Sequence, residues 1–142
     1  MTKSTLLRLA RCIARVVAFA LPLSAALADT PCAGVDRQLP GTEKQTLERA
    51  IAAEMRLPHV ELLQSYHHEG WHILYVATFR TDDTFLFYRR DPPCGRILAR
   101  WGGAAGKDEG PEIRRWVRRN VPGIPPCLAT CFAWHVTRDR DL

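Results

Sequence analysis

Residues 60–101 alternate between segments that favour strands and short segments that favour turns. The connections are rich in Gly, Pro and Asp, the residue types that close tight turns. The segments between them are rich in aromatic and β-branched residues, and they span 60–68, 71–80, 85–90 and 96–101. This pattern predicts an antiparallel meander of four strands.

The two turns also predict a register. A two-residue turn at Glu69-Gly70 pairs His67 with His72, whereas a four-residue turn at 81–84 pairs Phe79 with Leu86 and Ala77 with Tyr88. Apolar side chains then fall on both faces of the sheet. An antiparallel sheet with one face in solvent needs apolar side chains on its buried face alone. Apolar side chains on both faces therefore indicate that helices cover both, or that one face binds a partner.

Two helices flank the predicted strands. The first is expected to start at Thr42, which has capping-box spacing to Gln45, and to end before Pro58. A single apolar stripe at helical spacing runs between those two points. The second is expected to open at Gly110-Pro111 and to stop at Pro122.

The last segment, 127–137, fits two patterns. Phe132, Trp134 and Val136 alternate as in a strand, which favours a final strand at the sheet edge. Leu128, Cys131 and Phe132 would also line one face of a helix, so that alternative stays open. The predicted fold class is α+β: an N-terminal helix, a four-stranded antiparallel meander, a second helix and a C-terminal edge strand.

The N-terminal residues 1–28 have the pattern of a cleaved signal peptide. Four basic residues without an acid precede the apolar run 16–27, and Ala26-Leu27-Ala28 supplies small residues for cleavage. The run is shorter than the roughly 20 residues that cross a bilayer, so we expect no stable membrane span. We therefore expect residues 29–142 to form one α+β domain in the periplasm or outside the cell.

Removal of residues 1–28 changes the charge of the chain. Those residues hold four of the 20 basic side chains and none of the 15 acids, which leaves 16 − 15 = +1. A nearly neutral domain does not indicate a nucleic-acid partner. The excess of Arg over Lys, with abundant Ala and Pro, is typical of a GC-rich bacterial coding sequence.

Four cysteines remain after that cleavage. An even number in a small exported domain predicts disulfides, here two, with three connectivities open for Cys32, Cys94, Cys127 and Cys131. We favour the pairings that tie Cys32 and Cys94 to the C-terminal segment, because long loops give the larger stabilisation. An i, i+4 bridge between Cys127 and Cys131 stays open.

Two groups of side chains are candidate binding residues. His67 and His72 are predicted neighbours across the first hairpin, but zinc needs at least a third ligand, so we expect no resident metal. The basic candidates are Arg89 in the sheet and Arg114 and Arg118 on the second helix, which suit an anionic partner. No catalytic motif is present, and we expect no cofactor.

These observations favour an exported, non-catalytic domain that binds another protein of the cell envelope. An inhibitor or immunity protein against a cell-wall-directed enzyme is one such function, and the predicted fold is similar to that of cystatin-like modules and small periplasmic inhibitors. Folds do not fix function, so two alternatives stay open. One is a small metal- or His-dependent enzyme that uses His67, His72 and His135, and the other is a carrier of a small ligand.

Overall fold

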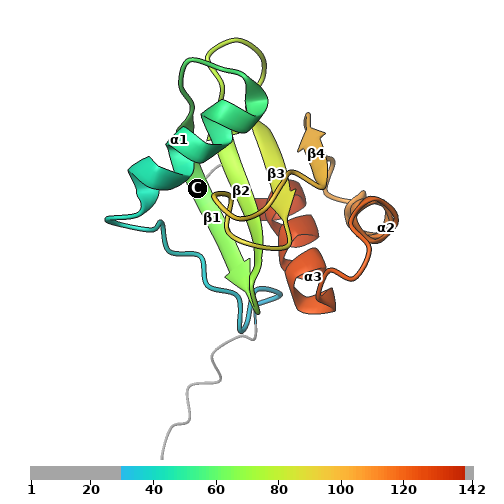
Figure 1. Ribbon diagram of the computed structural model, residues 1–142. Helices are drawn as coiled ribbons and strands as arrows, with labels where there is room; N and C mark the ends of the chain where they lie inside the picture. The colour runs from blue at the N-terminus through green and yellow to red at the C-terminus, as the bar shows by residue number, and fades with distance from the viewer. Residues whose placement is uncertain (1–29, 140–142) are drawn as a thin grey trace, which may run out of the picture.

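A four-stranded antiparallel sheet lies between helices in the computed structural model, which describes residues 30–139 (Figure 1). Its elements are α1 Lys44–Met55, β1 Glu61–His68, β2 Trp71–Ala77, β3 Thr84–Tyr88, β4 Ala99–Gly102, α2 Gly110–Asn120 and α3 Pro126–Trp134, followed by one π-helical turn, His135–Asp139. The strand order β1-β2-β3-β4 confirms the predicted meander and the α+β class. The expected signal peptide, residues 1–28, lies outside the described residues.

The first hairpin has the predicted register. Glu69 and Gly70 both have positive φ, 49° and 80°, which is the backbone that a two-residue hairpin turn requires. His67 pairs with His72 and Tyr66 with Ile73, as the sequence predicted.

The predicted register of the second hairpin is wrong. Leu86 pairs with Leu74 instead of Phe79, and Tyr88 pairs with His72 instead of Ala77. β2 ends early because Phe79 has a φ of 58°, a left-handed conformation that no strand continues through. The shift of five residues is odd, so it moves every side chain of β3 to the other face of the sheet.

Both faces of the sheet are apolar, and each is covered by helices of the same chain. In Figure 1, α1 crosses one face and α3 lies against the other, beside α2. The α1 face buries Leu62, Leu74, Val76, Leu86 and Tyr88, and the α3 face buries Tyr66, Trp71, Ile73, Phe85 and Phe87. The apolar pattern on both faces is therefore satisfied within the fold.

Helix α1 starts one residue later than the predicted capping box implies. Its N-cap is Glu43 rather than Thr42, and no side chain caps it, so the predicted capping box is not formed. The buried side of the helix includes Leu47 and Ile51, as the apolar stripe predicted. The helix ends at Arg56, whose left-handed conformation is the usual C-terminal stop.

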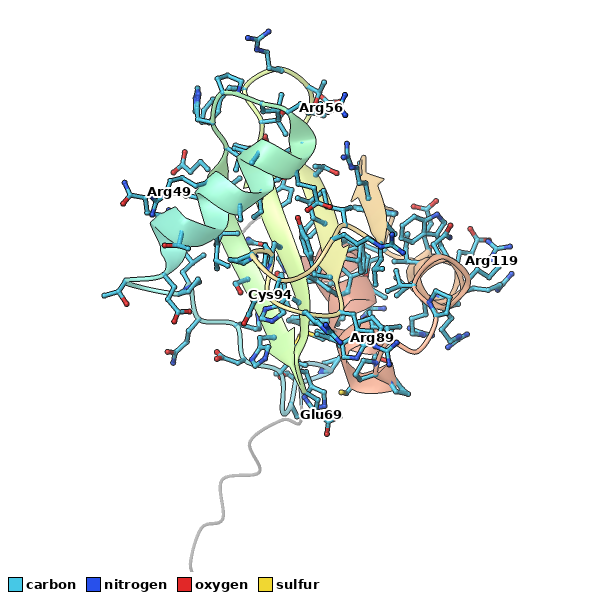
Figure 2. The ribbon with its side chains drawn as sticks, in the orientation of Figure 1. Arg49, Arg56, Glu69, Arg89, Cys94 and Arg119 are labelled. Atoms are coloured by element: carbon cyan, nitrogen blue, oxygen red, sulfur yellow. A yellow bond between two sulfur atoms is a disulfide. The ribbon has the colours of Figure 1, made fainter. Side chains whose placement is uncertain are left out.

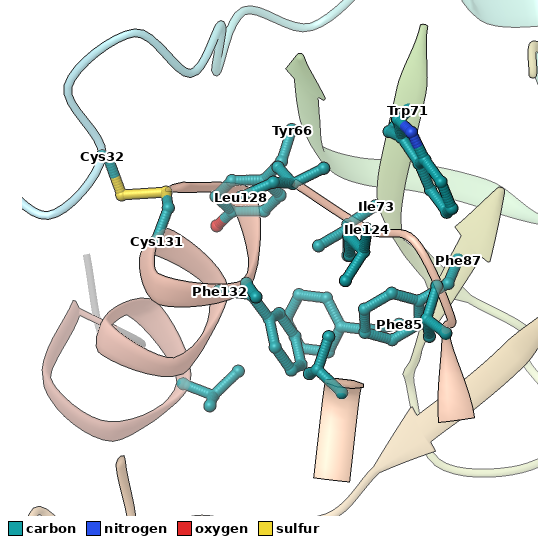
Figure 3. Close-up of a cluster of buried hydrophobic side chains, with 14 residues drawn as sticks. Cys32, Tyr66, Trp71, Ile73, Phe85, Phe87, Ile124, Leu128, Cys131 and Phe132 are labelled. Carbon is teal, nitrogen blue, oxygen red and sulfur yellow. A yellow bond between two sulfur atoms is a disulfide. The ribbon is translucent and has the colours of Figure 1, made fainter. Parts of the chain in front are cut away.

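The predicted C-terminal edge strand is wrong, because residues 126–134 form helix α3. Pro126 occupies its first turn, where the missing N–H of proline costs nothing. Leu128, Cys131 and Phe132 lie on one side of it and are buried, and Figure 3 shows Phe132 among Phe85 and Phe87. The helical alternative was the correct interpretation of this segment.

One disulfide joins the N-terminal segment to α3. Cys32 is bonded to Cys131 across a sequence separation of 99 residues, which confirms the tie between Cys32 and the C-terminal segment (Figure 3). Within residues 30–139, Cys94 and Cys127 are free thiols, so the second predicted disulfide is not formed.

Candidate functional site

The predicted histidine pair, His67 and His72, is present at the end of the first hairpin. The two rings stack with centroids 4.6 Å apart, and His72 Nε2 lies 2.9 Å from Asp91 Oδ1. Asp36 pairs with the backbone of His67 on the other side, through hydrogen bonds of 2.8 and 2.9 Å. Asp91 thus contacts the imidazole of His72, and Asp36 holds the backbone of His67.

The surroundings of His72 disfavour its protonation. Burial lowers the pKa of His72 below its ordinary 6.5, and the neighbouring His67 lowers it further, while the carboxylate of Asp91 opposes both. Because the net direction is downward, His72 is mainly neutral at pH 7.

The histidine pair lines a pocket of about 430 Å³ but is not part of a metal-ligand group among the described residues. Besides the pair, the pocket is lined by Ser65, Asp91, Leu47 and the segment 36–43. Among residues 30–139, no three His, Cys, Asp or Glu side chains are grouped as a metal site requires. The pocket therefore provides polar groups for binding, without a metal-ligand set.

His135 lies on the other face of the sheet from the histidine pair. It is 1% exposed and contacts the rings of Tyr66 and Phe85, with centroids 5.2 and 5.9 Å away. Tyr66 and His67 are successive residues of β1, so their side chains point to opposite faces. The structure does not bring together the three histidines of the enzyme hypothesis.

Of the three predicted arginines, Arg89 directly follows β3, whereas Arg114 and Arg118 lie one turn apart on α2. Arg89 extends over the ring of Trp71, with 5.6 Å from Cζ to the ring centroid. Arg114 and Arg118 lie on α2, where Arg114 lines a different pocket, of about 440 Å³, together with Trp134. Figure 2 shows Arg89 beside the sheet and Arg119 on the outer side of α2. They do not form one basic surface with the histidine pair.

The loop between β2 and β3, here called the Phe79 loop, spans residues 78–83, whereas the sequence analysis assigned residues 78–80 to a strand. The side chain of Phe79 is 60% exposed, the most exposed large apolar side chain described. Beside it, Thr78 is only 2% exposed, and its hydroxyl oxygen accepts the N–H groups of Arg80 and Thr81 at 3.4 and 3.1 Å. A buried hydroxyl thus holds the backbone that presents an exposed aromatic ring.

The Phe79 loop lies beside the connection between α1 and β1, at one end of the molecule (Figure 1). The rings of Phe79 and His59 are 4.9 Å apart between centroids. His59 also lines a groove of about 400 Å³ along α1, together with Leu57 and Pro58. An aromatic side chain and a partly apolar groove therefore adjoin at this end.

The sequence analysis placed a turn at 81–84, and the Thr78–Thr81 spacing was the signal that the loop begins earlier, because Ser and Thr side chains bond to backbone groups two or three residues away. The aromatic and β-branched content around it favoured a longer strand instead.

Comparisons with known proteins give no relative for this chain. It matches no protein-family model, no curated protein and no solved structure. In the part of the chain that the structure describes, no helix is both long and apolar enough to cross a membrane.

Proposed function

We propose that this protein is an exported, non-catalytic domain that binds another protein through the Phe79 loop. The observation that carries the proposal is the 60% exposure of Phe79 on a backbone that a buried threonine fixes. The disulfide supports the exported location, because disulfides persist mainly in oxidising compartments.

Exposed aromatic side chains are suited to protein recognition. A few aromatic and arginine side chains usually supply most of the binding energy of an interface, by filling pockets on the partner. Phe79 has this character, and the exposed Arg56 and Arg80 lie in the same two connections. In the free protein the ring of Phe79 contacts the ring of His59.

The backbone of the Phe79 loop is already organised for binding. A left-handed conformation costs a bulky residue about 1–2 kcal/mol, so it persists only where the surrounding structure imposes it. Here the hydrogen bonds of Thr78 impose it. A loop that is fixed before binding loses less conformational entropy on association.

The partner class that we propose is a cell-wall-directed enzyme, with this protein as its inhibitor or immunity protein. An aromatic side chain at the end of a fixed loop fits a concave surface, and the cleft of a hydrolase is such a surface. This assignment rests on the proposed export of the chain and on the shape of the loop.

Site-specific cross-linking tests the proposal. A photoreactive phenylalanine analogue at position 79, expressed in the native host, is expected to give one dominant adduct that mass spectrometry can identify. The same analogue at Leu39, which is 45% exposed in another loop, is the matched control. The identified partner is then purified, and its Kd is measured for the wild type, Phe79→Ala and Leu39→Ala.

We expect Phe79→Ala to weaken binding at least about 30-fold, which corresponds to a hot-spot loss of about 2 kcal/mol. Leu39→Ala is expected to leave the Kd within about twofold. Equal cross-linking at both positions, or a complex that Phe79→Ala does not weaken, would contradict the proposal.

A further inference from the structure

A pocket of about 560 Å³ lies beside the loop that connects β3 to β4, and we call it the arginine pocket. Three of its lining residues are arginines and none is acidic; the set is Arg89, Arg90, Cys94, Gly95, Arg96 and Leu98. All six belong to this one loop, residues 89–98, so the fold of the loop decides where the positive charges lie.

The loop is tightly folded. Cys94 N–H donates to the carbonyl oxygen of Asp91 at 2.8 Å, and Gly95 N–H donates to that of Pro92 at 3.4 Å. A Cβ atom at Gly95 would lie 2.9 Å from the backbone oxygen of Arg90, closer than real contacts allow. Because position 95 has no side chain, the chain can turn back and place Arg96 near Arg90.

Contacts outside the loop fix both of its ends. Glu54 Oε1 on α1 accepts the N–H of Ile97 at 2.6 Å, and the carbonyl oxygen of Phe87 accepts the N–H of Leu98 at 2.9 Å. The guanidinium of Arg89 lies over the ring of Trp71. The pocket is therefore formed by an anchored backbone, with the arginine side chains at its walls.

No acidic residue lines the pocket, so no carboxylate stands among its three positive charges. The one acid of the loop, Asp91, lies against His72 and lines the other pocket, on the side of the histidine pair. None of the three arginines forms an ion pair with a carboxylate of residues 30–139. Three like charges around one pocket favour the binding of an anion.

We propose that the arginine pocket binds a phosphoryl group. A single carboxylate would leave two of three positive charges unbalanced, whereas a phosphate monoester carries about two negative charges near pH 7 and a diphosphate carries more. The planar guanidinium groups also suit bidentate bonds to phosphoryl oxygens. This ligand is additional to the protein partner proposed for the Phe79 loop.

Leu98 gives the pocket an apolar wall. It is 39% exposed, so it can contact the organic part of a phosphorylated ligand. The phosphoryl group can belong to a soluble phosphate ester or to a lipid headgroup at a membrane surface, and both present the same chemistry to the arginines.

Titration calorimetry with pyrophosphate tests the site. We expect saturable binding to the wild type, a Kd about tenfold or more higher for the double variant Arg90→Gln/Arg96→Gln, and no binding of acetate. Arg89 is kept because it packs on Trp71. The matched control is Arg114→Gln/Arg118→Gln, which removes the same charge from α2 and is expected to stay within about twofold of wild type.

Cys94 gives a second readout, because its free thiol lines the same pocket. Pyrophosphate is expected to slow the alkylation of Cys94 in the wild type but not in Arg90→Gln/Arg96→Gln, with Cys127 as the internal control. Circular dichroism of both double variants is the control for folding, and both are expected to give the wild-type spectrum.

Vesicles of phosphatidic acid, whose headgroup is a phosphate monoester, and phosphatidylcholine in equal parts distinguish the two sources of the phosphoryl group. Retention that pyrophosphate displaces, and that only Arg90→Gln/Arg96→Gln loses, supports the site and assigns it to a headgroup. Pyrophosphate binding without retention supports the site and assigns it to a soluble ester. The proposal is overturned if neither probe binds, if acetate binds as tightly as pyrophosphate, or if both double variants lose binding equally.

Discussion

Glu54 connects α1 to β3 and to the segment that precedes β4. Its Oε2 accepts the hydroxyl of Tyr88 at 3.0 Å, and its Oε1 accepts the N–H of Ile97 at 2.6 Å. Burial and the adjacent carboxylate together raise the pKa of Tyr88 far above its ordinary 10.0, so its hydroxyl stays protonated and can donate. One side chain thus satisfies two donors from different elements.

Replacing Glu54 by Ala removes both acceptors. We expect the free energy of unfolding to fall by about 1–3 kcal/mol, because the hydroxyl of the buried Tyr88 loses its partner. Urea denaturation measures this change. The control is Glu61→Ala, at an exposed acid of β1, which is expected to stay within about 0.5 kcal/mol of wild type. Equal effects of the two variants would show that the bonds of Glu54 add no stability.

His72 makes stability depend on pH. Its pKa is lowered in the folded protein, so below the ordinary value of 6.5 the unfolded chain takes up a proton that the folded chain resists. The free energy of unfolding therefore falls as the pH drops from 6.5 toward the lower folded pKa, and the full contribution is present above 6.5.

Urea denaturation of the wild type and His72→Gln at about pH 7.5 and about pH 5 measures that contribution. Between the higher and the lower pH, the free energy of unfolding is expected to fall more for the wild type than for the variant. This comparison holds even if the two proteins differ in stability at the higher pH. The same loss in both proteins would show that His72 does not cause the pH dependence.

At the scale of elements, the disulfide is the covalent link between the N-terminal segment and α3. The double variant Cys32→Ala/Cys131→Ala is expected to lose about 3–5 kcal/mol, since the bridge closes a loop of nearly a hundred residues. Urea denaturation of the oxidised proteins tests this. Cys94→Ala/Cys127→Ala is the control and is expected to change stability by less than about 1 kcal/mol. A control that destabilises as much as the disulfide variant would contradict this account.

The two free thiols within residues 30–139 can be located chemically. Alkylation of the unfolded, unreduced protein, followed by peptide mass spectrometry, is expected to label Cys94 and Cys127 and to leave Cys32 and Cys131 unlabelled. A peptide pair joined through Cys94 and Cys127 would instead restore the second disulfide that the cysteine count predicted.

Local turn chemistry decided which elements could be predicted from the sequence. At Glu69-Gly70 the turn and the strand pattern agree, so the register of β1 and β2 follows from the residues. At the Phe79 loop the apolar pattern continues past the point where the Thr78 hydroxyl ends the strand, and the predicted register fails there. Segment 126–134 is too short for the period of its apolar residues to distinguish a strand from a helix.

The candidate sites depend on contacts between distant residues, which a sequence alone does not reveal. The proximity of His67 and His72 could be predicted from the hairpin register, and their rings stack. The approach of Asp91 to His72 depends on how the β3–β4 loop folds back, and the burial of His135 depends on α3. The sequence therefore predicted the pair but not its partners or its separation from the third histidine.

At the scale of the whole molecule, two hydrophobic cores share one sheet. Strands β2 and β3 contribute side chains to both cores, so loss of either core removes support from the strands of the other. The four tryptophans belong to the α3 side, where they form or pack against its core; they are Trp71, Trp101, Trp116 and Trp134. Tryptophan fluorescence thus reports on one core, and far-UV circular dichroism reports on both.

This arrangement predicts that both cores unfold together. Ile51→Ala, on α1, is expected to lower the free energy of unfolding by about 2–5 kcal/mol and to shift the fluorescence and dichroism midpoints equally. Leu128→Ala, on α3, is the matched variant in the core that contains the tryptophans. A fluorescence midpoint that Ile51→Ala leaves unchanged would show that the α1 layer unfolds independently.

The long separation between Cys32 and Cys131 also orders events in time. Cys32 is synthesised 99 residues before its partner, which at usual rates of translation is a delay of roughly 5–20 s. The hairpins and the first two helices are complete in the chain before Cys131 exists, and such elements form in microseconds. The cross-link can therefore form only after all four strands and the first two helices have been synthesised, so it is the last of these constraints on the fold to become available.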